Sequence, residues 1–291
     1  MTKLLTVCCA ATLASAAFGQ TFVSGTGIDA NPCTRTSPCA TFQRAVNVTP
    51  YGGTVSVLDT GNYGPVVIQQ EITIDGEGLG TILISTTASA VVIDVPASQS
   101  VRIRNLNLVT NSSSASVGIN FVSGIQVILD NVKVNGFPYG INVGLSGGGY
   151  ADLFIRNSTI SDSTYGIWIT SSGPSITAEI SNTSILGAFI GLSASAGRIS
   201  LRDSTVSALN IASGSVGLAI AGADVMVDNC QITRYPVGIQ ASSLVQLSRS
   251  TLSYNVTAVQ TQTGGVVTTL GNNSFFVNSA IGGPFTVGGL Q

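Results

Sequence analysis

The chain has 291 residues, of which only 8% are charged, and it contains 34 glycines and no histidine, with a formal net charge of −2 at pH 7. A weakly acidic balance argues against nucleic acid as a partner, because nucleic-acid binding needs clustered basic residues. The low charge and high glycine content favour a fold with many turns and little helix, and histidine-based catalysis is excluded.

The first 19 residues have the pattern of a secretory signal peptide. Lys3 supplies a positive start, residues 4–17 form an apolar stretch, and Ala17-Phe18-Gly19 offers small residues for cleavage. We expect residues 1–19 to be removed and the protein to be secreted, or held in a periplasm or at the cell surface; a retained N-terminal anchor is the alternative. No later apolar run approaches the roughly 18 residues of a membrane helix, so no membrane span is expected in the mature chain.

Residues 20–52 are predicted to form an N-terminal cap that contains a disulfide loop. Cys33 and Cys39 are close in the sequence, and in an oxidising compartment such a pair is expected to form a disulfide. A metal site would need two further ligands, and the chain has no histidine to supply them.

A short amphipathic helix is predicted over residues 40–48. Phe42, Ala45 and Val46 follow the i, i+3, i+4 spacing of one helical face. We expect this helix to cover the apolar end and the unpaired strand edge of the repeat region that follows.

Residues 53–277 contain a short pattern that recurs along the chain. Each unit opens with a small residue and an aliphatic one, continues with alternating apolar residues, and ends with Asn or Asp before Ser or Thr. An apolar period of two indicates strands, and a repeat of this length indicates stacked units. The sequence therefore predicts an all-β solenoid of roughly nine to ten coils, followed by a C-terminal cap or tail over residues 278–291 that folds over the last coil. The clearest openers are Gly118, Gly140, Gly166, Gly191, Gly217, Gly238 and Ala258, which are 22, 26, 25, 26, 21 and 20 residues apart.

Stacking is expected to align equivalent residues in columns. Asn tolerates the left-handed conformation and can hydrogen-bond between coils, and the turn column is mostly Asn: Asn105, Asn131, Asn157, Asn182, Asp203, Asn229, Arg249 and Asn273. An inward column is aliphatic throughout: Ile119, Ile141, Ile167, Leu192, Leu218, Ile239 and Val259. A third column is small and mostly hydroxylic, and its hydroxyls are expected to bond one another: Val132, Ser158, Thr183, Ser204, Cys230, Ser250 and Ser274. Within it, Cys230 is expected to be a buried, unreactive thiol.

Together these features resemble a known architecture. The openers Gly140-Ile141 and Gly238-Ile239, the stacked Asn turn and the coil length are similar to the pectate-lyase (pectin-lyase-like) superfamily, and Thr21–Tyr63 resembles the cap of secreted bacterial β-helix-repeat proteins. The resemblance implies a single-stranded, right-handed parallel β-helix over nearly all of the mature chain. Because this architecture hosts lyases, hydrolases and adhesins, it implies no one activity.

The resemblance also implies which catalytic groups to look for. Lyases of the superfamily use Arg or Lys as a base with a calcium cluster of carboxylates, and polygalacturonases use paired Asp residues with a histidine that this chain lacks. The segments Val127–Asn131 and Val225–Asn229 are similar to the Val-Trp-Ile-Asp-His motif of pectate lyases, with Asn in place of His, but a structural role in the repeating turn explains them equally well. Asp75 and Glu77 form either a turn or a calcium site. No catalytic residue, metal ligand or cofactor is therefore assigned.

One outward column is predicted to bind carbohydrate. It includes Asn120, Asn142 and Trp168, the only tryptophan, and Tyr139 and Tyr165 lie beside two of the openers. An exposed aromatic ring can stack on a sugar face while amides bond the sugar hydroxyls.

Two functions remain open from the sequence. The preferred one is binding of an extracellular or cell-envelope polysaccharide, with lyase-like cleavage as an extension of it. The alternative is a non-enzymatic adhesin or surface-structural solenoid, and in that case a neighbouring loop, residues 146–150, can simply cover the Trp168 ring.

Overall fold

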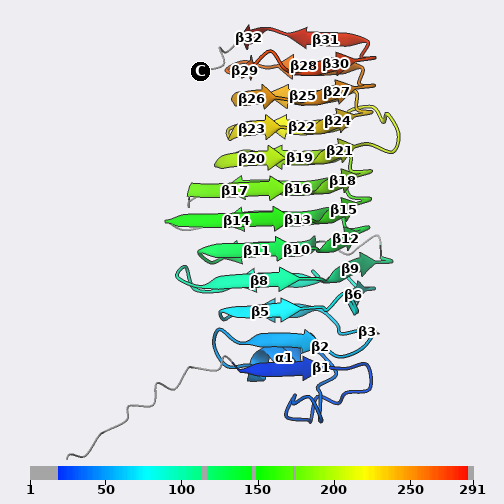
Figure 1. The fold of residues 1–291 in the computed structure, drawn as a ribbon, viewed down its shortest axis with the longest axis vertical. Helices are drawn as coiled ribbons and strands as arrows, with labels where there is room; N and C mark the ends of the chain where they lie inside the picture. The colour runs from blue at the N-terminus through cyan, green and yellow to red at the C-terminus, as the bar shows by residue number, and fades with distance from the viewer. Residues whose placement is uncertain (1–18, 113–116, 146–148, 173–174, 288–291) are drawn as a thin grey trace, which may run out of the picture.

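The computed structural model describes residues 19–112, 117–145, 149–172 and 175–287. Within these residues the chain climbs through successive windings of parallel strands, with one short helix near the N-terminal end (Figure 1). The predicted signal peptide, apart from Gly19, lies outside the described residues.

The strands form three parallel sheets that run the length of the stack, and each winding passes through them in turn. Sheet 1 has 12 strands: β1 (Gln20–Val23), β2 (Thr54–Val57), β5 (Ile72–Asp75), β8 (Ser100–Arg104), β11 (Gln126–Asp130), β14 (Tyr150–Arg156), β17 (Ser175–Ser181), β20 (Arg198–Arg202), β23 (Asp224–Asp228), β26 (Leu244–Ser248), β29 (Val266–Thr269) and β32 (Phe285–Val287). Sheet 2 has 10 strands: β3 (Gly61–Asn62), β6 (Gly80–Ile84), β9 (Asn107–Thr110), β12 (Lys133–Asn135), β15 (Thr159–Ser161), β18 (Ser184–Leu186), β21 (Thr205–Ser207), β24 (Gln231–Thr233), β27 (Thr251–Ser253) and β30 (Ser274–Phe276). Sheet 3 has 10 strands: β4 (Val66–Ile68), β7 (Val91–Asp94), β10 (Val117–Ser123), β13 (Tyr139–Leu145), β16 (Tyr165–Ser171), β19 (Ile190–Ala194), β22 (Val216–Ile220), β25 (Val237–Ala241), β28 (Thr257–Thr261) and β31 (Ala280–Gly283).

This architecture is the all-β parallel solenoid that the repeat predicts. The number of coils differs slightly from the expected nine to ten. The sheets have unequal numbers of strands, because β1 and β32 extend sheet 1 to 12 strands while sheets 2 and 3 have 10 each. The C-terminal segment also differs from expectation. Instead of folding over the last coil, β31 and β32 pair with β28 and β29 and continue the sheets, because an unpaired strand edge offers backbone groups that a further strand can bond.

The interior is formed by the aliphatic column that the sequence predicts. Ile119 pairs with Ile141, Ile141 with Ile167, and Ile167 with Leu192, and the same register continues to Val259. All are buried. Since burying each such side chain contributes about 1.5–3 kcal/mol, stacking supplies the core that no winding can form by itself.

The turn between sheets 1 and 2 carries a ladder of side-chain amides, as expected. Most residues of the turn column adopt left-handed φ values, from 48° to 54°, which Asn tolerates better than most residues. The ladder is not continuous, because the Asn157 amide donates to Asp130 Oδ1 at 2.8 Å and the Arg249 guanidinium bonds Asp228. Its regular bonds join Asn131 to Asn105 at 2.9 Å, Asn182 to Asn157 at 2.7 Å and Asn229 to Asp203 at 2.6 Å.

The hydroxyl column bonds the backbone rather than itself, so that expectation is wrong. The Ser158 hydroxyl accepts the Val132 N–H at 3.1 Å and donates to the Arg156 carbonyl at 2.7 Å. Ser204 repeats the arrangement, accepting the Thr183 N–H at 3.1 Å. The reason is that the turn leaves backbone groups unpaired where a strand ends, and buried backbone groups need partners.

Helix α1 (Phe42–Val48) covers the N-terminal end of the stack, as predicted. It begins at Thr41, whose hydroxyl caps it by accepting a first-turn N–H. Phe42, Ala45 and Val46 are buried, and the helix packs against β1, β2 and β4.

The cap also contains the predicted disulfide between Cys33 and Cys39, whose Cα atoms are 4.7 Å apart. The loop is tied to β1, because the Phe22 N–H bonds the Cys33 carbonyl at 2.8 Å and the Cys39 N–H bonds the Phe22 carbonyl at 3.0 Å.

We predict that Ile167→Ala lowers the free energy of unfolding by about 2–5 kcal/mol, because it leaves a cavity in the inward column. Lys133→Ala on the exposed side of β12 is the matched control and is expected to change stability by less than about 0.5 kcal/mol. Urea denaturation followed by circular dichroism measures both, and equal losses in the two variants would contradict the inward assignment.

Candidate functional site

The outer face of sheet 3 carries the residues predicted to bind carbohydrate. Strand pairing places Asn120 beside Asn142, and Asn142 beside Trp168. Their neighbours in each strand face the core, and successive side chains in a strand point to opposite faces, so these three point outward. All three are half-buried.

Three aromatic rings gather on this face. The Tyr139 and Tyr165 rings stack with centroids 5.3 Å apart and planes 7° apart. The Trp168 ring stacks on both, 4.9 Å from Tyr139 and 5.3 Å from Tyr165. We call these rings, with Asn120 and Asn142, the aromatic platform. The loop expected as an alternative cover, residues 146–150, lies partly outside the described residues.

A slip in side-chain alternation brings the tyrosines to this face. Tyr139 and Asn142 are three residues apart, yet neither is buried in the core, because Gly140 and Ile141 both face inward. Gly140 has no room for a side chain: a Cβ there would lie 2.5 Å from the Gly166 carbonyl oxygen and 2.5 Å from a methyl of Ile160. The glycine therefore lets sheets 2 and 3 approach closely while the tyrosine turns outward.

The amide of Asn142 has unused hydrogen-bonding capacity. Its Nδ2 donates to Asn120 Oδ1 at 2.7 Å, whereas its Oδ1 is shielded from solvent and has no hydrogen-bond partner among the described residues. A buried acceptor without a partner costs about 1–3 kcal/mol. A hydroxyl from a ligand, or a bound water, would satisfy it.

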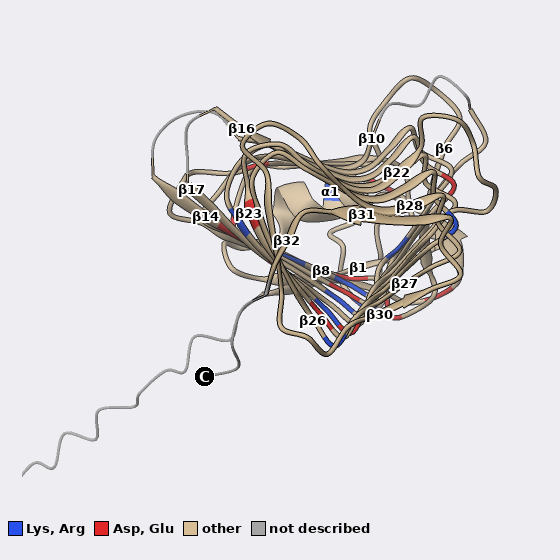
Figure 2. Ribbon diagram, turned by 90° about the horizontal axis from the view of Figure 1, so that it is seen from above, with Lys and Arg blue, Asp and Glu red and all other residues tan. Residues whose placement is uncertain are grey.

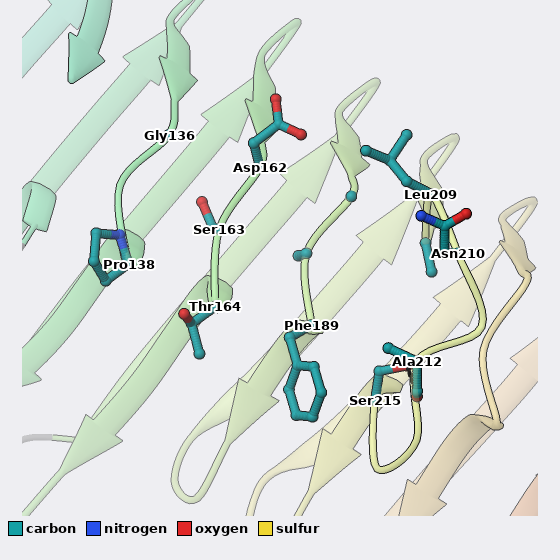
Figure 3. A pocket seen from close by; sticks show the side chains of 13 residues that line it. Gly136, Pro138, Asp162, Ser163, Thr164, Phe189, Leu209, Asn210, Ala212 and Ser215 are labelled. Atoms are coloured by element: carbon teal, nitrogen blue, oxygen red, sulfur yellow. Dashed lines mark hydrogen bonds between the residues drawn. The ribbon is translucent and has the colours of Figure 1, made fainter. Parts of the chain in front are cut away.

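A hollow of about 380 Å³ adjoins the aromatic platform at the corner between sheets 2 and 3. Pro138, Thr164 and Phe189 line it immediately before β13, β16 and β19, and Asp162 and Leu209 close its other side (Figure 3). Sequence reasoning missed this hollow, although the three lining positions directly precede the starts of the sheet 3 strands.

A second hollow of about 350 Å³ lies at the opposite ends of the same strands, where Gly144, Thr170 and Ser195 line it. The platform thus lies between two hollows along the strand direction. A seven-residue strand such as β13 spans about 23 Å at 3.3 Å per residue, so the face is long enough for several sugar units.

The residues that resemble a lyase motif make hydrogen bonds that stabilise the turn between sheets 1 and 2. Asp130 accepts from Asn157, and Asn131 has a φ of 53° and donates to Asn105. In the second copy Asp228 pairs with Arg249, and the hydrogen bond from that guanidinium lowers the pKa of the Asp228 carboxyl. The structural role left open by the sequence is therefore the one that the contacts support.

Asp75 and Glu77 form a turn, which is one of the two alternatives left open by the sequence. Asp75 Oδ1 accepts from the Glu77 N–H and from Asn105 Nδ2, both at 2.9 Å, while Oδ2 lies 2.6 Å from Arg104 Nε. These contacts engage both oxygens of the buried carboxylate. Across the described ranges, no group of three or more His, Cys, Asp or Glu side chains lies as metal ligands would.

Cys230 is buried, as predicted, and its thiol donates to the Asp228 carbonyl at 3.2 Å. Burial raises the pKa of Cys230 to about 11. The thiolate, which is the reactive form, is therefore scarce at neutral pH.

Comparisons with known proteins agree with this architecture. Residues 139–289 match a family described as right handed beta helix region. The crystal structure of pectate lyase Pel9A is similar, with 13% sequence identity, a TM-score of 0.51, and coverage of 92% of this chain and 79% of that chain. The native GH136 lacto-N-biosidase from Eubacterium ramulus is also similar, at 14% identity and a TM-score of 0.45, covering 89% of this chain and 59% of that chain.

At these identities the likeness to solved structures concerns the fold alone. No curated protein matches the sequence. In the part of the chain that the structure describes, no helix is both long and apolar enough to cross a membrane.

We predict that the Cys230 thiol of the chain lacking residues 1–19 resists a disulfide reagent at pH 8. At three pH units below a pKa of about 11, roughly 0.1% of it is thiolate. Absorbance of the released thiolate reports the reaction, and the same protein in 8 M urea is the control, where the thiol is expected to react fully. Fast reaction of the native protein would show that the thiol is accessible and activated.

Proposed function

This chain belongs to the right-handed beta-helix family, and from that premise we propose that it binds an extracellular or cell-envelope polysaccharide on the outer face of sheet 3. The observation that carries the proposal is the aromatic platform: Tyr139, Tyr165 and Trp168 stack on one another beside the paired amides of Asn120 and Asn142.

The chemistry of the platform suits a sugar. A pyranose ring has an apolar C–H face and hydroxyls at its edge, and aromatic rings pack against the first while amides bond the second. Trp168 and the tyrosines supply the rings, and Asn120 and Asn142 supply donors and acceptors. The hollows before and after the platform provide space for the neighbouring units of a chain.

The wider context supports a polysaccharide as the ligand. The fold is shared with a protein named as a pectate lyase, so parallel β-helices of this kind include an enzyme that acts on such a polymer. Export through the signal peptide proposed for residues 1–19 would bring the protein to polysaccharides outside the cell. Cleavage is a separate activity, which is measured as ultraviolet absorbance from unsaturated sugar ends.

We predict that a bound oligosaccharide changes the intrinsic fluorescence of Trp168, the only tryptophan in the chain. The physical reason is that the ligand replaces water at the half-buried indole ring. A titration against a panel of polysaccharides, read by emission intensity and wavelength, identifies the ligand.

Calorimetry then measures variants with that ligand. Trp168→Ala is expected to weaken binding by about 10- to 100-fold, as loss of a central aromatic anchor does, and Trp168→Phe to retain part of the affinity. Tyr51→Ala is the matched control, because Tyr51 is an exposed aromatic residue of the N-terminal cap. Absence of glycan binding across the panel, or binding indifferent to Trp168, would refute the proposal and favour a structural solenoid.

A further inference from the structure

The strands of sheet 3 are almost free of charged side chains. Its 10 strands carry one charged residue, Asp94 of β7. By contrast, β20 and β23 of sheet 1 alone carry Arg198, Arg202, Asp224 and Asp228. Viewed down the stack, blue and red bands gather along sheet 1, whereas β10 and β22 run through a region drawn almost wholly in tan (Figure 2).

Two aspartates lie at the margins of the outer face of sheet 3. Asp94 is exposed at the end of β7 and accepts from the Ser123 hydroxyl at 2.7 Å. Asp162 lines the corner hollow that leads onto the platform. Neither hollow is lined by a lysine or arginine among its described residues.

A polyuronate fits this surface poorly. Such a polymer carries one carboxylate per sugar, and a carboxylate moved out of water onto an uncharged sheet loses hydration that only a cation or several donors can replace. Each aspartate also repels it, by about 1 kcal/mol at 4 Å in water. Uncharged hydroxyls incur neither cost, because amides and hydroxyls bond them directly.

The outer face of sheet 3 offers such partners beyond the platform. In the same column as Asn120 and Asn142, Gln240 and Gln260 follow on later windings, and their side chains bond each other at 3.3 Å. From Asn120 to Gln260 this column therefore holds four amides, one aromatic ring and two small residues, all of them uncharged.

We propose that the aromatic platform selects a glycan built of uncharged sugars and discriminates against polyuronates. This inference rests on the proposed function and adds the class of ligand. Selectivity comes from the lack of a compensating cation on sheet 3 together with the aspartates at its margin, rather than from the shape of the platform.

The experiment compares uncharged glycans with acidic ones on the intact mature chain. Neutral probes are linear glucan, xylan and mannan oligosaccharides, and acidic probes are oligogalacturonate and oligomannuronate, all measured by calorimetry at 20 mM and 500 mM salt. At least one neutral probe is expected to bind, with a dissociation constant that changes less than twofold between the two salt concentrations. Acidic probes are expected to bind at least tenfold more weakly at 20 mM salt.

A charge-gain variant tests the cause. Ser193 pairs with Trp168 on the outer face, so Ser193→Arg places a cation beside the ring. It is expected to strengthen binding of oligogalacturonate at least fivefold at 20 mM salt, and 500 mM salt is expected to remove the gain. Ser193→Gln, with a long but uncharged side chain, controls for bulk and is expected to show no gain.

The outcomes separate this inference from the proposed function. The inference is overturned if an acidic probe binds more tightly than every neutral probe and loses affinity in Trp168→Ala. In that case the proposed binding site on sheet 3 still stands. An acidic probe that binds equally well to wild type and Trp168→Ala uses another face; if a neutral probe then needs Trp168, the inference stands. If no probe binds, or none depends on Trp168, the proposed function fails and the inference fails with it.

Discussion

Parallel pairing of each strand with its equivalent one winding away is the constraint on which this structure depends. Residues 20 to 26 positions apart in the sequence become neighbours, as Ile141 does with Ile167 and Ile167 with Leu192. Because side chains alternate between faces with a period of two, a shift of register by one residue would move the whole aliphatic column from core to solvent. The burial of that column therefore fixes the register everywhere else.

The platform is a product of the same register. Tyr139 and Asn142 come from one winding, Tyr165 and Trp168 from the next, and Asn120 from the winding before. No winding carries enough of these groups to hold a sugar alone. Stacking also separates the faces of the molecule. Ion pairs and the Asn ladder lie along sheet 1 and its turn, while the strands of sheet 3 carry a single charged residue, Asp94.

Much of the fold could be predicted from the sequence, because equivalent positions in successive repeats are expected to be neighbours in the stack. The inward column, the Asn turn, the capping helix over Phe42 and the Cys33–Cys39 disulfide are confirmed, since each follows from local spacing and a common register. The partners of the Ser158 hydroxyl were not predictable in this way, because backbone groups freed at a turn have no signature in the side-chain pattern.

The candidate site could be predicted only in part, because some of its geometry departs from the regular side-chain pattern. The outward position of Trp168 follows from alternation, but its stacking on Tyr139 depends on the slip at Gly140, where two consecutive residues face inward. The corner hollow depends on the shapes of the connections between sheets 2 and 3. The periodic pattern of apolar residues in the strands carries no information about those shapes. The signal peptide, export and carbohydrate binding remain predictions and proposals.

The emission spectrum of Trp168 tests the central claim most directly, because it reports whether a residue 29 positions away lies against the ring, as Tyr139 does at 4.9 Å. Tyr139→Ala is predicted to shift the emission to longer wavelength and to increase quenching by acrylamide, while Tyr51→Ala leaves both unchanged. An emission spectrum and quenching constant unaltered by Tyr139→Ala would contradict the register from which the platform is built.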